Sequence, residues 1–196
     1  MLARAESDNA RLREAFPAGF ALDAEHRPHI TLLQCFVAVK DLKSVYDAAG
    51  DVIRNANVTG MELRAVRRGY TPGPGMGVAG IWAALTPELS KLQADVVAAA
   101  RPFMAPTATI DAFTASHANP AFDAALIKYV SEFVAKGAGA NFDPHVSTGV
   151  APIDYLDRMV AEPFAPFAFA PAGAAVYQLG PFGTAARLLK RWDLAG

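Results

Sequence analysis

The tetrapeptide at residues 28–31, Pro-His-Ile-Thr, recurs at residues 144–147 as Pro-His-Val-Ser. Each copy has a proline, a histidine, a β-branched aliphatic residue and a hydroxyl residue. Each copy also begins a stretch that favours a β-strand. Two copies of such a short pattern are far less expected by chance than one. We therefore treat the repeat as the feature around which the fold and the candidate site are organised.

Side chains on a strand alternate between its two faces. His29 and Thr31 should therefore project together from one strand, as should His145 and Ser147 from another. The two histidines are 116 residues apart, since 145 − 29 = 116. That separation is too long for one hairpin and suits two similar lobes.

Composition limits the class of protein. The chain has 196 residues, 53% of them hydrophobic, which is enough for a sizeable core. The net charge of −1 provides no basic field to hold long duplex nucleic acid. Cys35 is the single cysteine, so no disulfide framework exists and a reducing compartment fits. No apolar run is long enough for a membrane span, and Glu6 and Asp8 lie where a signal peptide would be apolar. We expect a cytoplasmic protein that does not enter a membrane and is a monomer.

Periodicity, cap residues and turn residues predict a mixture of helices and strands without strict alternation. Helices are expected at 2–16, 42–53, 87–103, 120–136 and 152–159. Strands are expected at 29–39, at 61–85 as two strands around a Gly/Pro-rich loop, and at 143–150, 164–169 and 174–179. The predicted fold class is α+β: one bilobal domain over 1–196, with two antiparallel sheets and flanking helices related by a pseudo-twofold around a central cleft. The first motif lobe is expected around 20–60 and the second around 140–180.

Two imidazoles and two hydroxyls facing one cleft suit a specific chemistry. Histidine has the side-chain pKa nearest neutrality, so one neutral ring can accept a proton from water while one charged ring donates a proton to a leaving oxygen. Hydroxyls can donate hydrogen bonds to phosphate oxygens as charge develops there. These groups could open or close a phosphodiester with neither a metal nor another cofactor.

The two motifs, extended at the second copy to Asp143-Pro-His-Val-Ser-Thr148, resemble those of the 2H phosphoesterase superfamily, which includes the bacterial 2′-5′ RNA ligase-like proteins. The resemblance implies a metal-free phosphodiesterase acting on 2′,3′-cyclic or 2′-5′ phosphodiester bonds of a small nucleotide or an RNA end. It further implies that His145 is the general base and His29 the general acid in hydrolysis. Thr31 and Ser147 would then hold the phosphate.

Other residues are candidates for substrate contact. Within 67–70 (Arg-Arg-Gly-Tyr), Arg68 could supply positive charge and Tyr70 a stacking ring, although an exposed strand edge is the commoner use of such a stretch. Phe182, in the stretch Gly180-Pro181-Phe182-Gly183, could lie beside the cleft or in the core. Cys35 is expected in the core, and His26 and His117 on the surface or in loops.

Three functions remain open from the sequence: a metal-free phosphodiesterase, a module that only binds nucleotides or RNA ends, and a metal-dependent hydrolase. The last would bring His26, His29, Asp143 and His145 together as metal ligands. That arrangement would leave the hydroxyls of the two motifs without a clear role.

Overall fold

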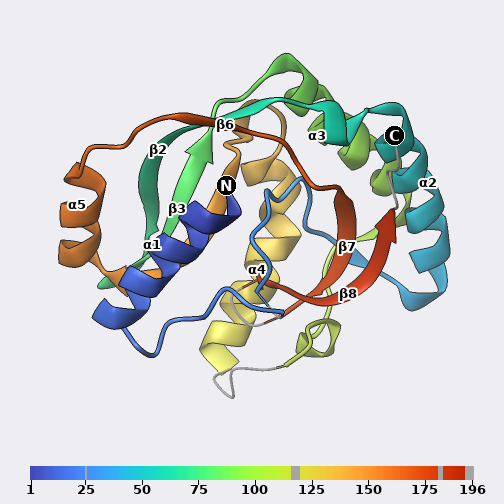
Figure 1. The fold of residues 1–196 in the computed structure, drawn as a ribbon. Helices are drawn as coiled ribbons and strands as arrows, with labels where there is room; N and C mark the ends of the chain where they lie inside the picture. The colour runs from blue at the N-terminus through green and yellow to red at the C-terminus, as the bar shows by residue number, and fades with distance from the viewer. Residues whose placement is uncertain (25, 116–119, 181–182, 193–196) are drawn as a thin grey trace. The chain divides into compact units, whose positions relative to one another are not determined.

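A computed structural model describes residues 1–24, 26–115, 120–180 and 183–192 (Figure 1). The fold is α+β with antiparallel sheets, as the sequence predicts. The chain divides into two compact units. Unit 1 comprises Met1–Thr31, Glu62–Ala84 and Asp143–Phe169, and unit 2 comprises the described residues of Leu32–Met61, Leu85–Phe142 and Ala170–Gly196.

Unit 1 is built on an antiparallel sheet with strand order β5-β3-β2-β6. Its elements are α1 (Leu2–Ala15), β2 (Leu63–Pro72), β3 (Met76–Ala83), β5 (His145–Pro152), α5 (Ile153–Ala161) and β6 (Phe167–Phe169). Ile30 adds a single antiparallel bridge to β5 at Val146, on the edge of β5 that faces away from β3. The Gly/Pro-rich stretch around 73–75 joins β2 to β3, as its turn residues predict.

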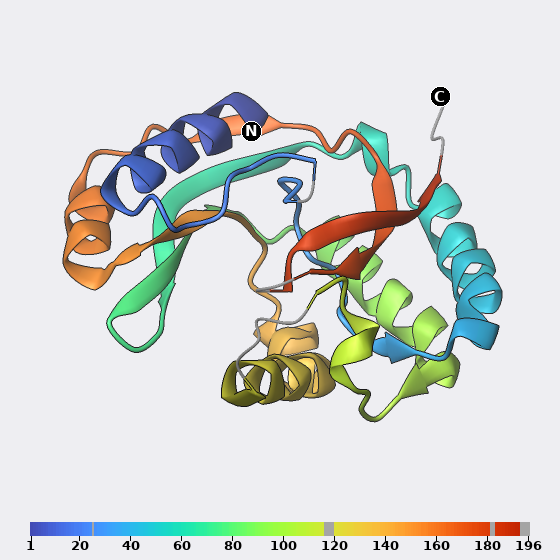
Figure 2. The same cartoon turned by 90° about the horizontal axis from the view of Figure 1, so that it is seen from below.

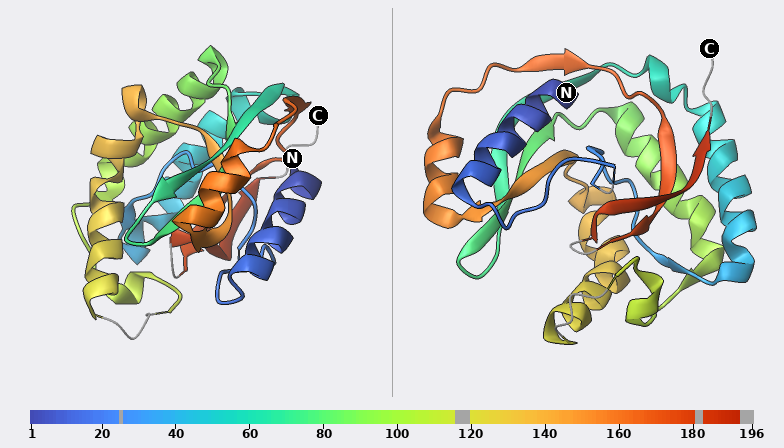
Figure 3. Two further views of the ribbon diagram at one scale, coloured as in Figure 1. Left: turned by 90° about the vertical axis from the view of Figure 1, so that its left-hand side faces the viewer. Right: turned by 60° about the horizontal axis from the view of Figure 1, so that its bottom comes forward.

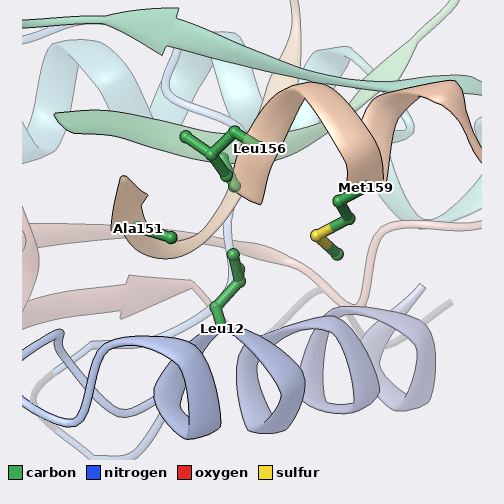
Figure 4. Close-up of a cluster of buried hydrophobic side chains, with 5 residues drawn as sticks. Leu12, Ala151, Leu156 and Met159 are labelled. Carbon is green, nitrogen blue, oxygen red and sulfur yellow. The ribbon is translucent and has the colours of Figure 1, made fainter. Parts of the chain in front are cut away.

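Helices α1 and α5 cover one face of this sheet (Figure 2). The core beneath them is a cluster of buried apolar side chains that come from both helices and from the two strands next to them (Figure 4). Its members are Leu12, Ala79, Ala151, Leu156 and Met159. Burial of these side chains is what fixes the helices on the sheet.

A buried ion pair also links α1 to the sheet. Arg68 on β2 donates from Nε and Nη2 to the two carboxylate oxygens of Asp8 on α1, at 2.8 and 2.9 Å. Both side chains are almost fully buried, at 8% and 2% exposed. Arg68 Nη1 also lies 3.8 Å from Glu162, and the bond to Asp8 raises the pKa of the guanidinium. Arg68 therefore holds the helix to the sheet.

Unit 2 combines helices with two short antiparallel pairs, β1 with β4 and β7 with β8. Its helices and strands are β1 (Phe36–Val37), α2 (Leu42–Asn55), α3 (Pro87–Ala100), β4 (Met104–Ala105), α4 (Pro120–Gly137), β7 (Ala174–Leu179) and β8 (Ala185–Trp192). Short 3-10 helices lie at Val39–Asp41, Val58–Gly60, Arg101–Phe103, Ile110–Ala112 and Gly139–Asn141. Helices α2 and α3 pack side by side (Figure 3), and a buried cluster that includes Phe36, Phe113 and Val130 forms a core.

Two predictions about the motifs need correction. The strand expected at 29–39 is reduced to the bridge at Ile30 and the two residues of β1, because little of this stretch has a partner strand for its backbone groups. The motifs were also expected in separate lobes, around 20–60 and 140–180. Both motifs lie in unit 1, because the first pairs directly with the second.

Over the residues that the structure describes, no helix combines the length and the apolar character needed to span a membrane.

Candidate active site

The two motifs lie next to each other as antiparallel segments joined by the bridge between Ile30 and Val146. These two residues share the face of the sheet that packs beneath α1, where Val146 is 3% exposed. Because side chains alternate along extended segments, the residues on either side of each project from the opposite face. Those neighbours are His29, Thr31, His145 and Ser147. All four are partly exposed.

The register of the bridge sets the arrangement of these four side chains. In an antiparallel pair centred on the bridge, His29 lies opposite Ser147 and Thr31 lies opposite His145. The histidines are therefore diagonal neighbours, and so are the hydroxyls. Diagonal positions on one face of an antiparallel pair are about 7–8 Å apart. Two imidazoles at this separation can lie on either side of a group the size of a phosphate.

The two imidazoles are held in the same way. His29 Nδ1–H donates to the carbonyl oxygen of Arg27 at 2.5 Å, and His145 Nδ1–H donates to the carbonyl oxygen of Asp143 at 2.8 Å. A carbonyl oxygen can only accept, so each bond places a proton on Nδ1. In the neutral ring, Nε2 is then free to accept a proton from a ligand. The same local bond, from each histidine to the residue two positions earlier, gives both motifs one tautomer.

The surroundings of His29 change the pKa of its imidazole. Burial lowers the pKa of His29 because the charged ring loses solvation, and the positive charge of His145 lowers it further. The bond to the Arg27 carbonyl opposes this shift in part. The lowered pKa therefore favours the neutral form of the His29 imidazole.

Residues paired side by side across neighbouring strands form a row of the sheet. The row that contains His145 carries further polar and aromatic groups. Across the strands, His145 pairs with Trp82 on β3, and Trp82 pairs with Arg67 on β2. The Trp82 and His145 rings stack with centroids 4.8 Å apart and 20° between their planes. The Arg67 guanidinium carbon lies 4.4 Å from the centroid of the Trp82 ring. Trp82 Nε1–H donates to the Asp143 carboxylate at 2.5 Å, and Arg67 lies 3.8 Å from the same carboxylate.

The neighbouring row contains two glycines that make room for the indole. A Cβ added to Gly80 would lie 3.1 Å from the Trp82 ring and 3.0 Å from the Val146 carbonyl oxygen. A Cβ added to Gly69 would lie 3.0 Å from the Trp82 ring. Both glycines therefore allow the ring to lie flat beside His145.

The predicted substrate-binding residues Arg68 and Tyr70 lie on the other face of the sheet. Arg68 pairs across the strands with Ile81 and is committed to Asp8. Tyr70 packs beside the cluster under α5, and its hydroxyl donates to Asp157 at 2.6 Å. Both side chains therefore lie on the face opposite the histidines, and substrate contact by Arg68 and Tyr70 stays a prediction. The prediction for Phe182 lies outside the described residues.

Sequence reasoning did not single out Trp82, and it considered Asp143 only as a metal ligand and Arg67 only as part of the stretch 67–70. Alternation correctly groups Arg68 with Tyr70, but it does not say which face carries the histidines. One signal for Trp82 was available in the spacing Gly80-x-Trp82. It places a large indole and a glycine, which has no side chain, on the same face of one strand, so the indole has room to lie flat. Arg67-x-Gly69 has the same spacing on the neighbouring strand.

The remaining histidine and cysteine predictions concern residues outside this cluster. His26 stacks on Phe20 with centroids 5.3 Å apart, and its Nδ1 lies 3.3 Å from the Asp23 carboxylate. His117 lies outside the described residues. Burial raises the pKa of the partly buried Cys35 thiol to about 11. In the parts of the chain that the structure describes, no three His, Cys, Asp or Glu side chains gather as a metal site would require.

Comparison with known proteins supports the fold. The described chain is an α+β protein with two His-x-hydroxyl motifs paired on one sheet. Its fold is similar to the crystal structure of TT0787 of Thermus thermophilus, with a TM-score of 0.53 and 19% sequence identity over 98% of this chain and 90% of that chain. No family model matches the sequence. No curated protein matches it either.

Proposed function

We propose that this protein is a metal-free phosphodiesterase that acts on 2′,3′-cyclic or 2′-5′ phosphodiester bonds of nucleotides or RNA ends, as a 2H-type phosphoesterase. The observation that carries the proposal is the antiparallel pairing centred on Ile30 and Val146. This pairing presents two histidines and two hydroxyls on one face of one sheet, in diagonal positions.

The arrangement suits in-line displacement at phosphorus. Attacking water and leaving oxygen must be on opposite sides of the phosphorus, and diagonal histidines supply one imidazole to each side. One neutral Nε2 removes a proton from water as its oxygen bonds to phosphorus. The other ring, as imidazolium, gives its Nε2 proton to the departing ester oxygen. Thr31 and Ser147 donate hydrogen bonds to the non-bridging oxygens as their charge grows. The products are a phosphomonoester and a free hydroxyl.

The roles of the histidines follow from the resemblance of their motifs, and the lowered pKa of His29 sets a condition on its role. The resemblance implies that His145 is the base and His29 the acid in hydrolysis. His29 then needs its proton restored before it can act as the acid. A bound phosphodiester supplies that change, because its negative charge beside the imidazole favours the charged ring. In the reverse direction, a neutral His29 would be the base that activates a hydroxyl.

The substrate class follows from the size and charge of the site. The four groups can surround one phosphate, and the net charge of the whole chain is −1, so a long duplex has no basic track to follow. We propose a small nucleotide or a single RNA end as the ligand of a monomeric cytoplasmic enzyme. The single cysteine is consistent with that compartment.

The deciding experiment measures hydrolysis of 2′,3′-cyclic nucleotides in excess chelator. The wild-type protein should be active, whereas His29→Ala and His145→Ala should each lose most of the rate on the unactivated substrate. His26→Ala is the matched control, because His26 lies outside the two motifs and its ring is stacked on Phe20, and its rate should equal that of the wild type.

The two alternatives give different outcomes in the same assay. Activity that is lost in chelator and restored by a divalent cation would identify a metal-dependent hydrolase. Saturable binding of 2′-nucleotides with no turnover under either condition would identify a binding module. Either result would overturn the proposal of metal-free catalysis.

A further inference from the structure

The two motifs are symmetric in sequence and in local hydrogen bonding, but their surroundings differ. His145 lies in the row with Trp82 and Arg67, whereas His29 lies in the row with Ser147 and the glycines at 80 and 69. Within the described residues, no aromatic ring stacks on His29. Among the described residues, an aromatic ring therefore supports the His145 imidazole and none supports that of His29.

The support for His145 is a three-layer stack across neighbouring strands. The imidazole lies against the indole of Trp82, and the Arg67 guanidinium lies over the indole. A cation over the face of an indole and a ring stacked on it are both favourable contacts. Trp82 is only 5% exposed, so it is a fixed part of the sheet face rather than a free surface for a base. Its position restricts rotation of the imidazole about the Cβ–Cγ bond.

Asp143 connects this stack to the imidazole at a second point. Its carboxylate accepts from Trp82 Nε1 and lies 3.8 Å from Arg67, while its main-chain carbonyl accepts from His145 Nδ1 at 2.8 Å. One residue therefore fixes both the indole and the tautomer of the imidazole. Of the residues that the structure describes, the charged or titratable groups that face this imidazole are Asp143, Arg67 and, diagonally, His29.

We propose that Trp82 is a positioning residue for His145, held in place by Arg67 and Asp143, and that it fixes the direction of His145 Nε2 but not that of His29. The inference rests on the proposed function, since it assigns this stack to the histidine that acts as the base. Fixing the plane of one imidazole matters for catalysis because an ångström of misplacement can cost a factor of about 100 in rate.

The experiment combines kinetics with nuclear magnetic resonance of the histidine ring nitrogens in the full chain. Trp82→Leu removes both the stack and the Nε1 bond, and it should lower kcat on a 2′,3′-cyclic nucleotide by about 10- to 100-fold with KM changed less than about twofold. His145 should lose its single Nδ1–H tautomer, whereas the His29 signals should stay as in the wild type. Trp82→Phe keeps a stacked ring and should show a smaller loss.

A second pair of variants tests the guanidinium layer of the stack without removing the buried Trp82 side chain. Arg67→Met removes the cation from a side chain that is 53% exposed and should loosen the His145 signals. Arg158→Met is the matched control, because Arg158 is 69% exposed on α5 at the other face of the sheet, and it should change nothing. If Trp82→Leu does not fold, the comparison is made with Trp82→Phe and Arg67→Met.

The ring-nitrogen signals separate the two possible failures. His145 signals unchanged from the wild type in the folded Trp82 and Arg67 variants, or equal changes at His29 and His145, would overturn the positioning role. A protein that is inactive on every phosphodiester but loses the His145 tautomer only in the Trp82 and Arg67 variants would overturn the proposed function and leave the positioning role standing.

Discussion

Arg68→Met should destabilise unit 1 strongly. The substitution leaves the Asp8 carboxylate, 2% exposed, without the cation that binds both of its oxygens. Removing one partner of a buried ion pair costs roughly 3–5 kcal/mol, because the remaining charge stays buried without compensation. Asp8→Leu should cost less, about 1.5–3 kcal/mol as for lost hydrogen bonds to a charged group, because Arg68 still has Glu162 at 3.8 Å.

The double variant makes this prediction specific. Asp8→Leu with Arg68→Met replaces the pair by apolar groups, which is often close to neutral, so its stability should be within about 1 kcal/mol of the wild type. The two substitutions should therefore be strongly non-additive. Native-state hydrogen exchange of the α1 and β5 amides measures the opening free energy of unit 1 without treating the whole chain as two-state.

Activity provides the control for this prediction. Arg68 is on the face of the sheet opposite the histidines, so the KM of folded Arg68→Met for a cyclic nucleotide should equal that of the wild type. The reasoning would be refuted if Arg68→Met lowered the opening free energy of unit 1 by less than about 1 kcal/mol, since roughly 3–5 kcal/mol is expected for a broken buried pair. A raised KM at full stability would do the same, and it would identify Arg68 as a ligand-binding residue.

Three further predictions concern the motif residues. Thr31→Val and Ser147→Ala should each slow turnover by a factor of about 10 to 1,000, since each removes a donor to developing charge; initial rates on a cyclic nucleotide check this, and unchanged rates in both would show that the hydroxyls only complete the strands. Because burial lowers the pKa of His29, the unfolded chain binds its proton more readily, so the wild type should lose stability relative to His29→Gln as pH falls from about 6.5 through the folded pKa. Melting temperatures of both proteins at several pH values test this, and a constant difference between them would contradict it. Replacing His29 should matter least for substrates with good leaving groups, whereas replacing His145 should be severe for every substrate; equal losses of His29→Ala on a poor and an activated phosphodiester would refute the assignment of His29 as the acid.

Local signals in the sequence predicted much of the fold. Thr86 and Pro87 predict a helix start, and the Leu89 amide donates to Thr86 Oγ1 at 3.1 Å at the beginning of α3. The Gly/Pro-rich stretch predicts the connection between β2 and β3. Such signals depend on a few neighbouring residues, so they can be recognised in a single sequence.

Long-range pairing could not be predicted in the same way. The stretch 29–39 has the composition of a strand, but a strand also needs a partner, and only Ile30, Phe36 and Val37 have one. Alternation showed that Arg68 and Tyr70 share a face, yet the choice of face is made by contact with α1 and α5. A single-residue difference in register separates buried Arg68 from Arg67 beside the site. The cleft between two lobes stays a prediction.

The assembly of unit 1 from three separated segments has a consequence for synthesis of the protein. The first motif is translated before its strand partner, which is 116 residues further along, from Ile30 to Val146. Contacts between such distant residues form late and slow the folding of a domain. During synthesis, the ribosome must therefore add a further 116 residues after Ile30 before its partner Val146 exists. A truncated product that ends before β5 would carry half of the motif pair and have none of its geometry.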